Sequence, residues 1–311
     1  MNNAGRRLSR EAQAAAQAFI FDQGRALEQA KYAFYFGDGD AGPVIEALAA
    51  FQNPDGGFGY ALEPDLRLEG SSVIATTVGL QTLREFRVSG DHPLVKGALG
   101  YLLATYDSAQ RVWPIIPSNI DDAPHAPWWV YSEDLAERWG GFLVNPRAEI
   151  VGYLHDYADL VPVDLTEQLT AAVIAYLDVH ADQVGMFDLL CYIRLVETES
   201  LPAETRAQLV EALTPLVDAL VVKDSAKWDS YVLTPLEVVE HPDAPFAELL
   251  AAPVAANLDF EVDRQGPDGA WGPTWSWGEL HPEAWAQAKQ EWSGIITLRK
   301  LRALERFGRL A

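Results

Sequence analysis

Cysteine, methionine and histidine are scarce in this sequence of 311 residues, which contains one cysteine, two methionines and six histidines. A single cysteine, Cys191, cannot form an internal disulfide, and this usage is typical of a reducing compartment. The histidines also lack the spacing of metal ligands. We therefore expect no metal ion and no cofactor.

Basic residues are few as well, because 23 lysines and arginines face 45 acidic residues, for a net charge of −22. A negative surface repels phosphate backbones and anionic lipid, so nucleic acid is not an expected partner. No uncharged stretch is long enough to span a bilayer, and Arg6, Arg7 and Arg10 precede no apolar signal segment. The sequence predicts a cytoplasmic protein and specifies no oligomeric state.

Long alternating runs of Val, Ile and Thr, which would indicate β-strands, are missing too. Ala, Leu, Glu and Gln dominate residues 10–36, 44–51, 165–180 and 204–222, a pattern that predicts helices. The apolar fraction of 49% excludes general disorder. We expect an all-α protein with one domain over residues 10–308 and a polar tail at residues 1–9.

The clearest positive feature is a segment that occurs twice, as QNPDGGFG at residues 52–59 and as QGPDGAWG at residues 265–272. Five positions are identical, and a sixth is aromatic in both copies. Pro presets one backbone angle, Asp can close an Asx turn and Gly reaches positive φ, so each copy predicts a tight turn between two helices. The following aromatic can pack between neighbouring helical hairpins.

Two weaker copies lie between the clear ones. Trp113 follows an apolar helical stretch at residues 94–106, and Trp228 follows another at residues 213–222. A repeated unit that cannot bury its apolar face alone predicts an array of helical hairpins.

These segments resemble the repeat of protein prenyltransferase β subunits and of squalene and terpene cyclases, where it is called the QW motif. The resemblance is strong over residues 50–83 and 262–303 and faint between them. It implies an α/α toroid, in which inner and outer helices close into a barrel around a central apolar cavity. It says more about architecture than about activity.

The zinc chemistry of the prenyltransferases is not expected, because those enzymes use an Asp-x-Cys pair and a distant His. The only cysteine here stands in Asp188-Leu189-Leu190-Cys191, at a different spacing. Toroidal lanthionine cyclases need two cysteines and are excluded by the same count. Cys191 is predicted to be a buried helical residue.

Class II terpene cyclases start cyclisation with a protonated Asp in an Asp-x-Asp-Asp motif. Residues 119–122 read Asn-Ile-Asp-Asp, so the first Asp of that motif is replaced. The resemblance implies Asp121 or Asp122 as the acid, and His125 is a further candidate for proton chemistry. The alternative is a pair of solvated acids in a loop.

The segment from residue 113 to residue 131 is long and rich in Pro and aromatics, and long structured loops are usually functional. A second aromatic segment follows the later copy of the repeat turn. Glu63 and Asp65 follow the earlier copy and could face the same site. Six aromatics are candidates for substrate contacts, with packing as the alternative for each: Trp113, Trp128, Trp129, Tyr131, Trp275 and Trp277.

Three classes of function remain open. A terpenoid-cyclase-like protein would use an aromatic-lined cavity for acid-initiated cyclisation of an isoprenoid or polyene. A carbohydrate-active α/α-barrel enzyme would combine Trp platforms with carboxylates. A non-catalytic toroid would bind an apolar ligand or partner. The first is the leading hypothesis, and the expected ligand is a small apolar or carbohydrate molecule in the central cavity.

Overall fold

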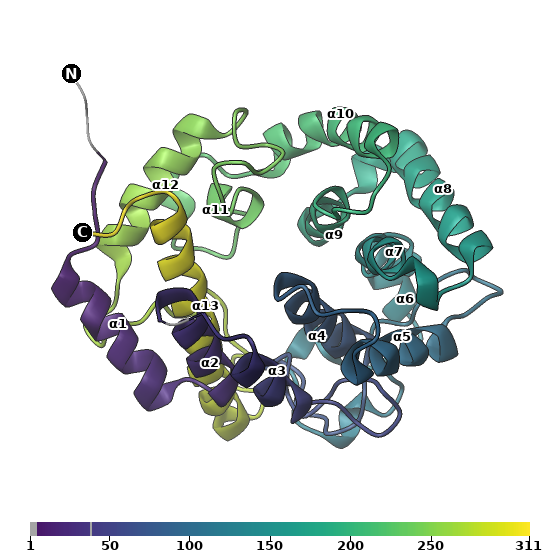
Figure 1. Cartoon of the computed structure of the whole chain (residues 1–311), viewed down its shortest axis with the longest axis horizontal. Coiled ribbons are helices and arrows are strands. Elements are labelled where there is room, and N and C mark those ends of the chain that lie inside the picture. The colour runs from purple at the N-terminus through teal and green to yellow at the C-terminus, as the bar shows by residue number, and fades with distance from the viewer. Residues whose placement is uncertain (1–4, 38) are drawn as a thin grey trace. The chain divides into compact units, whose positions relative to one another are not determined.

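The protein is all-α, as the sequence predicts (Figure 1). The computed structural model describes residues 5–37 and 39–311. Within these residues there are isolated β-bridges but no β-strands. The thirteen α-helices are α1 (Arg10–Gln23), α2 (Ala26–Phe36), α3 (Gly42–Ala49), α4 (Val73–Glu85), α5 (Pro93–Thr105), α6 (Leu135–Arg138), α7 (Arg147–Asp156), α8 (Val163–His180), α9 (Met186–Val196), α10 (Ala203–Leu220), α11 (Pro235–Val238), α12 (Ala251–Arg264) and α13 (Pro282–Arg306).

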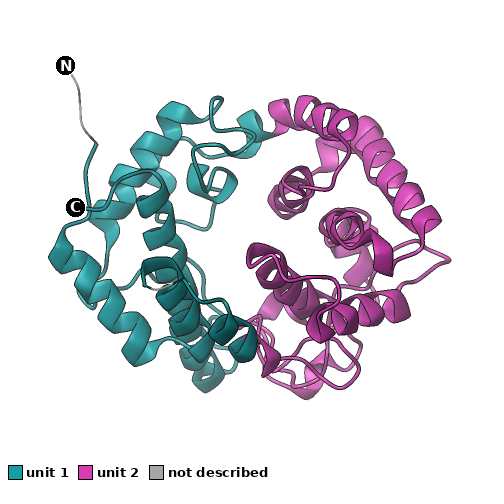
Figure 2. Ribbon diagram, viewed as in Figure 1, with its two compact units in different colours: residues 1–47, 217–311 teal, residues 48–216 magenta. Residues whose placement is uncertain are grey.

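The helices belong to two compact units, coloured separately in Figure 2. Unit 1 comprises residues 1–47 and 217–311, and unit 2 comprises residues 48–216. In unit 1, α13 packs against α1 and α2, and α11 packs against α12. In unit 2, α7 packs against α4, α8 and α9, and α4 packs against α5.

The first repeat turn, in unit 2, has the predicted turn chemistry. Asp55 Oδ1 accepts a hydrogen bond from the backbone N–H of Gly57 at 3.0 Å, which closes the Asx turn. Gly56 has φ +88°, a conformation that favours glycine. Gln52 Nε2 donates to the carbonyls of Gly56 and Leu94, both at 2.9 Å, and so ties the turn to the start of α5.

The second repeat turn, in unit 1, makes the same set of contacts. Asp268 Oδ1 accepts from Ala270 N at 3.1 Å, and Gly269 has φ +88°. Gln265 Nε2 donates to the carbonyls of Gly269 at 2.8 Å and of Ala12 at 2.9 Å. The chain therefore builds one local structure twice from matching residues.

The aromatic after each turn is buried and is held by a threonine. The N–H of Phe58 donates to Thr76 Oγ1 of α4, and the N–H of Trp271 donates to Thr297 Oγ1 of α13, each at 3.0 Å. Both rings are at most 1% exposed. Each ring lies in the interior of its unit, and burial of its apolar area stabilises that unit.

Helix α1 takes, at the second turn, the place that α5 takes at the first. A Cβ added to Gly56 would meet the backbone of Gly97 in α5, and one added to Gly269 would meet the backbone of Ala15 in α1. Figure 1 shows α1 and α13 side by side. The helix that completes the last hairpin thus comes from the start of the chain.

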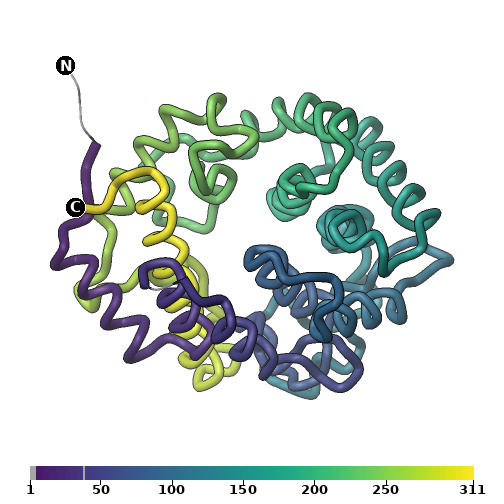
Figure 3. The backbone as a smooth tube through the Cα atoms, in the orientation of Figure 1, coloured from purple at the N-terminus to yellow at the C-terminus, as the bar shows by residue number. Residues whose placement is uncertain are grey.

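The two ends of the described chain are joined within unit 1, where the purple and yellow ends of the tube meet in Figure 3. Leu8 N donates to the carbonyl of Arg309 at 2.8 Å, and Ala311 N donates to the carbonyl of Leu8 at 3.0 Å. Leu8 is buried although it lies in the expected polar tail.

The weaker repeat copies share one contact with the second clear copy, namely an indole N–H that donates to a carbonyl at the end of the preceding helical segment. Trp113 donates to Leu102 and Trp228 donates to Val222, each at 2.6 Å, and Trp271 donates to Glu261 at 3.0 Å. All three rings are buried. Leu102 and Glu261 lie in the last turns of α5 and α12, whose carbonyls lack partners within the helix, whereas Val222 lies two residues beyond the end of α10.

The helical segment predicted at residues 10–36 forms two helices, α1 and α2. Helix α1 ends before Gly24, whose N–H bonds back to Ile20. None of the described helices is both long enough and apolar enough to cross a membrane.

Candidate functional site

The candidate loop at residues 113–131 is anchored in unit 2 by the segment that follows the first repeat turn. Leu66 and His125 form an antiparallel bridge. On either side of it, Arg67 N donates to the carbonyl of Pro124 at 3.0 Å, and Ala126 N donates to that of Asp65 at 2.9 Å. Glu63 and Asp65 are buried here, so the structure brings these acids to the same loop as Asp121.

The structure pairs two of the candidate catalytic residues. His125 Nε2 lies 3.0 Å from Asp121 Oδ1, and His125 Nδ1 lies 2.9 Å from the carbonyl oxygen of Ala126. Both neighbouring atoms are hydrogen-bond acceptors. The imidazole is buried, and it fixes the position of one carboxylate oxygen.

The two carboxylate oxygens of Asp121 differ in their contacts. Oδ1 accepts the contact from His125 and the N–H of Tyr131 at 3.2 Å, whereas Oδ2 has no hydrogen-bond partner in the described parts of the chain. The side chain of Asp121 is 53% exposed, and Asp122 is exposed as well. This geometry suits a general base or nucleophile that works in water.

The aromatics of the loop divide into packed and accessible side chains. Trp113 is fully buried beside Tyr106, with ring centroids 4.7 Å apart, so the packing alternative describes it. Trp129 is buried and stacks on Trp139 at 4.8 Å with an interplanar angle of 10°. Trp128 is half-buried and Tyr131 is 44% exposed, so these two remain available to a ligand.

The two later candidates belong to unit 1. Trp277 is buried beside Trp285, with centroids 5.6 Å apart, and packing describes it too. Trp275 is half-buried and meets Trp292 edge-on at 5.2 Å and Tyr231 at 5.5 Å. Trp275 therefore belongs to a partly accessible aromatic cluster.

A buried polar network around Glu149 of α7 has no signal in the sequence. Its Oε1 accepts hydrogen bonds from Gln81 Nε2 at 2.7 Å and from the hydroxyl of Tyr153. Its Oε2 lies 3.0 Å from Arg194 Nη1 and 3.9 Å from the Sγ of Cys191. The donors come from positions up to 113 residues apart, from Gln81 to Arg194, so no local pattern could reveal them.

Burial sets the chemistry of this network. Desolvation, followed by the charge of Glu149, raises the pKa of the Cys191 thiol well above its usual value. The same two causes raise the pKa of Tyr153. Cys191 is thus the buried helical residue that the sequence predicts, with the properties of an unreactive thiol.

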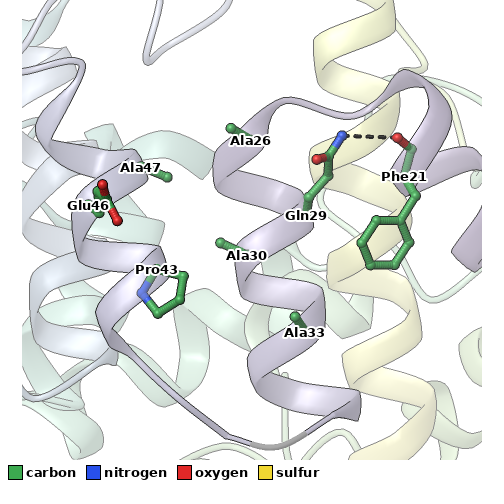
Figure 4. A pocket seen from close by; sticks show the side chains of 8 residues that line it. All are labelled: Phe21, Ala26, Gln29, Ala30, Ala33, Pro43, Glu46 and Ala47. Carbon is green, nitrogen blue, oxygen red and sulfur yellow. Dashed lines mark hydrogen bonds between the residues drawn. The ribbon is translucent and has the colours of Figure 1, made fainter.

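Potential ligand sites elsewhere are limited. Throughout residues 5–37 and 39–311, no group of three or more His, Cys, Asp and Glu side chains is placed to hold a metal ion. Unit 1 has an open groove of about 440 Å³ between α2 and α3, which Figure 4 shows beside Phe21. Alanines form much of its wall: the lining residues are Phe21, Ala26, Gln29, Ala30, Ala33, Pro43, Glu46 and Ala47.

Comparisons with known proteins assign no family. No protein-family model matches the chain, and no curated protein matches it. Among solved structures, the crystal structure of a protein from Actinoplanes is similar over 94% of this chain and 98% of that chain, with 13% sequence identity and a TM-score of 0.49. The structure itself defines an all-α protein in which the same turn occurs twice.

Proposed function

We propose that the chain is an α/α toroid of the prenyltransferase and terpene cyclase type. The supporting observation is the equivalence of the two repeat turns, in which Gln52 binds the first turn of α5 and Gln265 binds the first turn of α1. In a closed ring the first helix has to complete the last hairpin, as α1 does with α13. A crystal structure in which the hairpins form an open array would contradict this proposal.

Within that fold, we propose a carbohydrate-active enzyme whose reacting group is the carboxylate of Asp121. The observation that supports it is that Oδ1 of Asp121 is anchored by two contacts while the side chain as a whole is 53% exposed. His125 holds the carboxylate in place, and Trp128 and Tyr131 offer partly exposed rings on which a sugar can stack. Asp122, the next residue in the chain, supplies a second exposed carboxylate.

A terpenoid-cyclase-like activity is the second candidate, favoured by the repeat turn and by residues 119–122. Protonation of an alkene needs a carboxylic acid kept neutral in a dry site. The exposure of Asp121 and its two N–H contacts favour the polar substrate over the polyene. A non-catalytic toroid remains the reference against which both activities are tested.

A substrate panel separates these candidates. Purified protein is incubated with oligosaccharides and polysaccharides, and in parallel with polyenes such as squalene, and products are identified by mass spectrometry. Sugar turnover should fall by about 100-fold or more in Asp121→Asn. The matched control is Asp159→Asn, an exposed carboxylate of unit 2 outside the loop, which should keep full activity.

The other outcomes are equally informative. Cyclised polyene products that disappear in Asp121→Asn would replace the carbohydrate proposal with the cyclase. Turnover that survives in Asp121→Asn would contradict the role of this residue in either reaction. Trp128→Ala should raise KM with little change in kcat, because a stacking ring contributes to binding.

We also propose a cytoplasmic location, which is supported by the single cysteine and the acidic composition. The expected partner is a small ligand and not nucleic acid, because the net charge of −22 repels polyanions. Cell fractionation with an antibody against the chain tests the location, and recovery in a membrane or extracellular fraction would contradict it.

A further inference from the structure

Unit 2 contains a buried arginine without an acidic partner. Arg147, the first residue of α7, is 4% exposed. Its Nη1 donates one long hydrogen bond to the carbonyl of Arg111 at 3.3 Å, and its Nε has no hydrogen-bond partner. In the described part of the chain no carboxylate forms an ion pair with it. Four of the five N–H donors of this guanidinium therefore have no acceptor among the described residues.

A guanidinium in this position costs free energy unless an anion accompanies it. Desolvation lowers the pKa of Arg147, and the nearby phenols of Tyr192, Tyr106 and Tyr176 act in the opposite direction. These phenols belong to α9, the end of α5 and α8. The guanidinium is therefore close enough to interact with phenols from α8, α9 and the end of α5.

Two acids near these phenols, Asp107 and Asp188, accept hydrogen bonds from backbone N–H groups. Asp107 Oδ1 accepts from the backbone N–H groups of Ala109 and Gln110, at 2.9 and 3.0 Å. Asp188 Oδ2 accepts from the N–H of Gly185 at 3.0 Å and caps α9. In a chain with 45 acidic residues, this arginine is left without a counter-ion of its own.

A second arginine approaches the same point from solvent. Arg111 is exposed and forms no ion pair in the described structure. Burial raises the pKa of Tyr106, while the charges of Arg111 and Arg147 both lower it, so both guanidinium groups lie near this hydroxyl. Tyr106 and Tyr176 are half-buried, which leaves an approach from solvent.

We propose that Arg147, with Arg111 and Tyr106 at its entrance, binds a small oxyanion, either a carboxylate or a phosphate group. Charged N–H donors and a phenol hydroxyl are the partners that such oxygens accept from. The N-terminus of α7, a helix of ten residues, adds a favourable dipole at Arg147. This site does not depend on the proposed activity of Asp121.

Thermal unfolding of the whole protein tests the proposal, with inorganic phosphate, acetate and chloride compared at equal ionic strength. Phosphate or acetate should raise the Tm above its value in chloride, and the concentration dependence gives an apparent Kd. In Arg147→Met this dependence should disappear, because Met fills the buried position without the charge. The control is Lys96→Gln, which also removes one positive charge but at an exposed position in α5. This variant should respond like the wild type.

Arg111→Gln provides a variant that leaves the core untouched. Its apparent Kd should rise by about tenfold, as expected when a charge-assisted hydrogen bond is lost. A larger response to phosphate than to acetate assigns a phosphate ligand, and the reverse assigns a carboxylate. Equal Tm values in all three salts would overturn the proposal, and so would an anion response that both arginine variants retain.

Discussion

Gly56 is the residue whose replacement the first repeat turn should tolerate least. Its φ is +88°, and a Cβ built there would lie 2.3 Å from the carbonyl oxygen of Gly97. The three Gly97 atoms that this Cβ would meet all belong to the backbone, so no side chain can move aside. Only a residue without a Cβ lets the turn approach α5 this closely.

We expect Gly56→Ala to destabilise the protein by about 2–4 kcal/mol, from left-handed strain together with overpacking. Gly278→Ala is the matched control, because Gly278 also has positive φ but a Cβ there would meet no atom within 4 Å. It should cost only about 1–2 kcal/mol of strain. Urea unfolding measures both, and equal losses would show that the contact with Gly97 is unimportant.

Cys191 should resist alkylation in the folded protein. The thiolate is the reactive form, and burial beside Glu149 raises the pKa of this thiol. Iodoacetamide at pH 8 should leave it unmodified in buffer and label it fully in denaturant, as read by mass spectrometry. Rapid labelling of the native protein would contradict the burial of this residue.

At the scale of elements, the Glu149 network joins three helices of unit 2. Gln81 belongs to α4, Glu149 and Tyr153 to α7, and Arg194 to α9. Next to it, Arg84 of α4 forms an ion pair with Asp156 at 2.8 Å and covers the ring of Tyr153 at 4.4 Å. The packing of α7 therefore depends on polar contacts as well as on apolar area.

Glu149→Ala should destabilise the protein by about 3–5 kcal/mol, because it removes the acceptor of the buried Tyr153 hydroxyl and of the half-buried Arg194 and Gln81. The control is Glu167→Ala on the exposed face of α8, which should change stability by less than about 0.5 kcal/mol. Both are compared by urea unfolding monitored by circular dichroism. A loss below about 1 kcal/mol for Glu149→Ala would mean that the network contributes little net stability.

At the scale of the whole molecule, the pairing of the chain ends has a measurable consequence. Residues 309–311 supply backbone bonds to Leu8, and Arg309 Nη1 donates to Asp259 Oδ1 at 2.6 Å. Removing these three residues should cost about 2–3 kcal/mol, since Leu8 loses its cover and several hydrogen bonds are lost. Arg309→Gln keeps the backbone bonds and should cost less. An unchanged Tm after truncation would contradict this account.

The all-α class and the two repeat turns were predictable because their signals are local. Pro, Asp and Gly within one octapeptide specify a turn through dihedral preferences and a single side-chain hydrogen bond, as Asp55 and Asp268 show. The roles of Asp121 and Asp122 stay predictions, although their position in an exposed loop matches one alternative that the sequence left open.

The candidate site was harder to predict, since burial depends on which surfaces meet. Composition alone cannot separate Trp113, which packs in the core, from Trp128, which remains half-buried in the same loop. Nor can it find Arg147, an ordinary residue at a helix start in the sequence.

The sequence by itself determined the helical class, the two repeat turns and the negative charge, because each follows from neighbouring residues or from simple counts. Only the tertiary structure decided which polar groups are buried together. It brings Gln81 to Glu149 and leaves Arg147 without an acid, because such contacts join residues that are far apart along the chain.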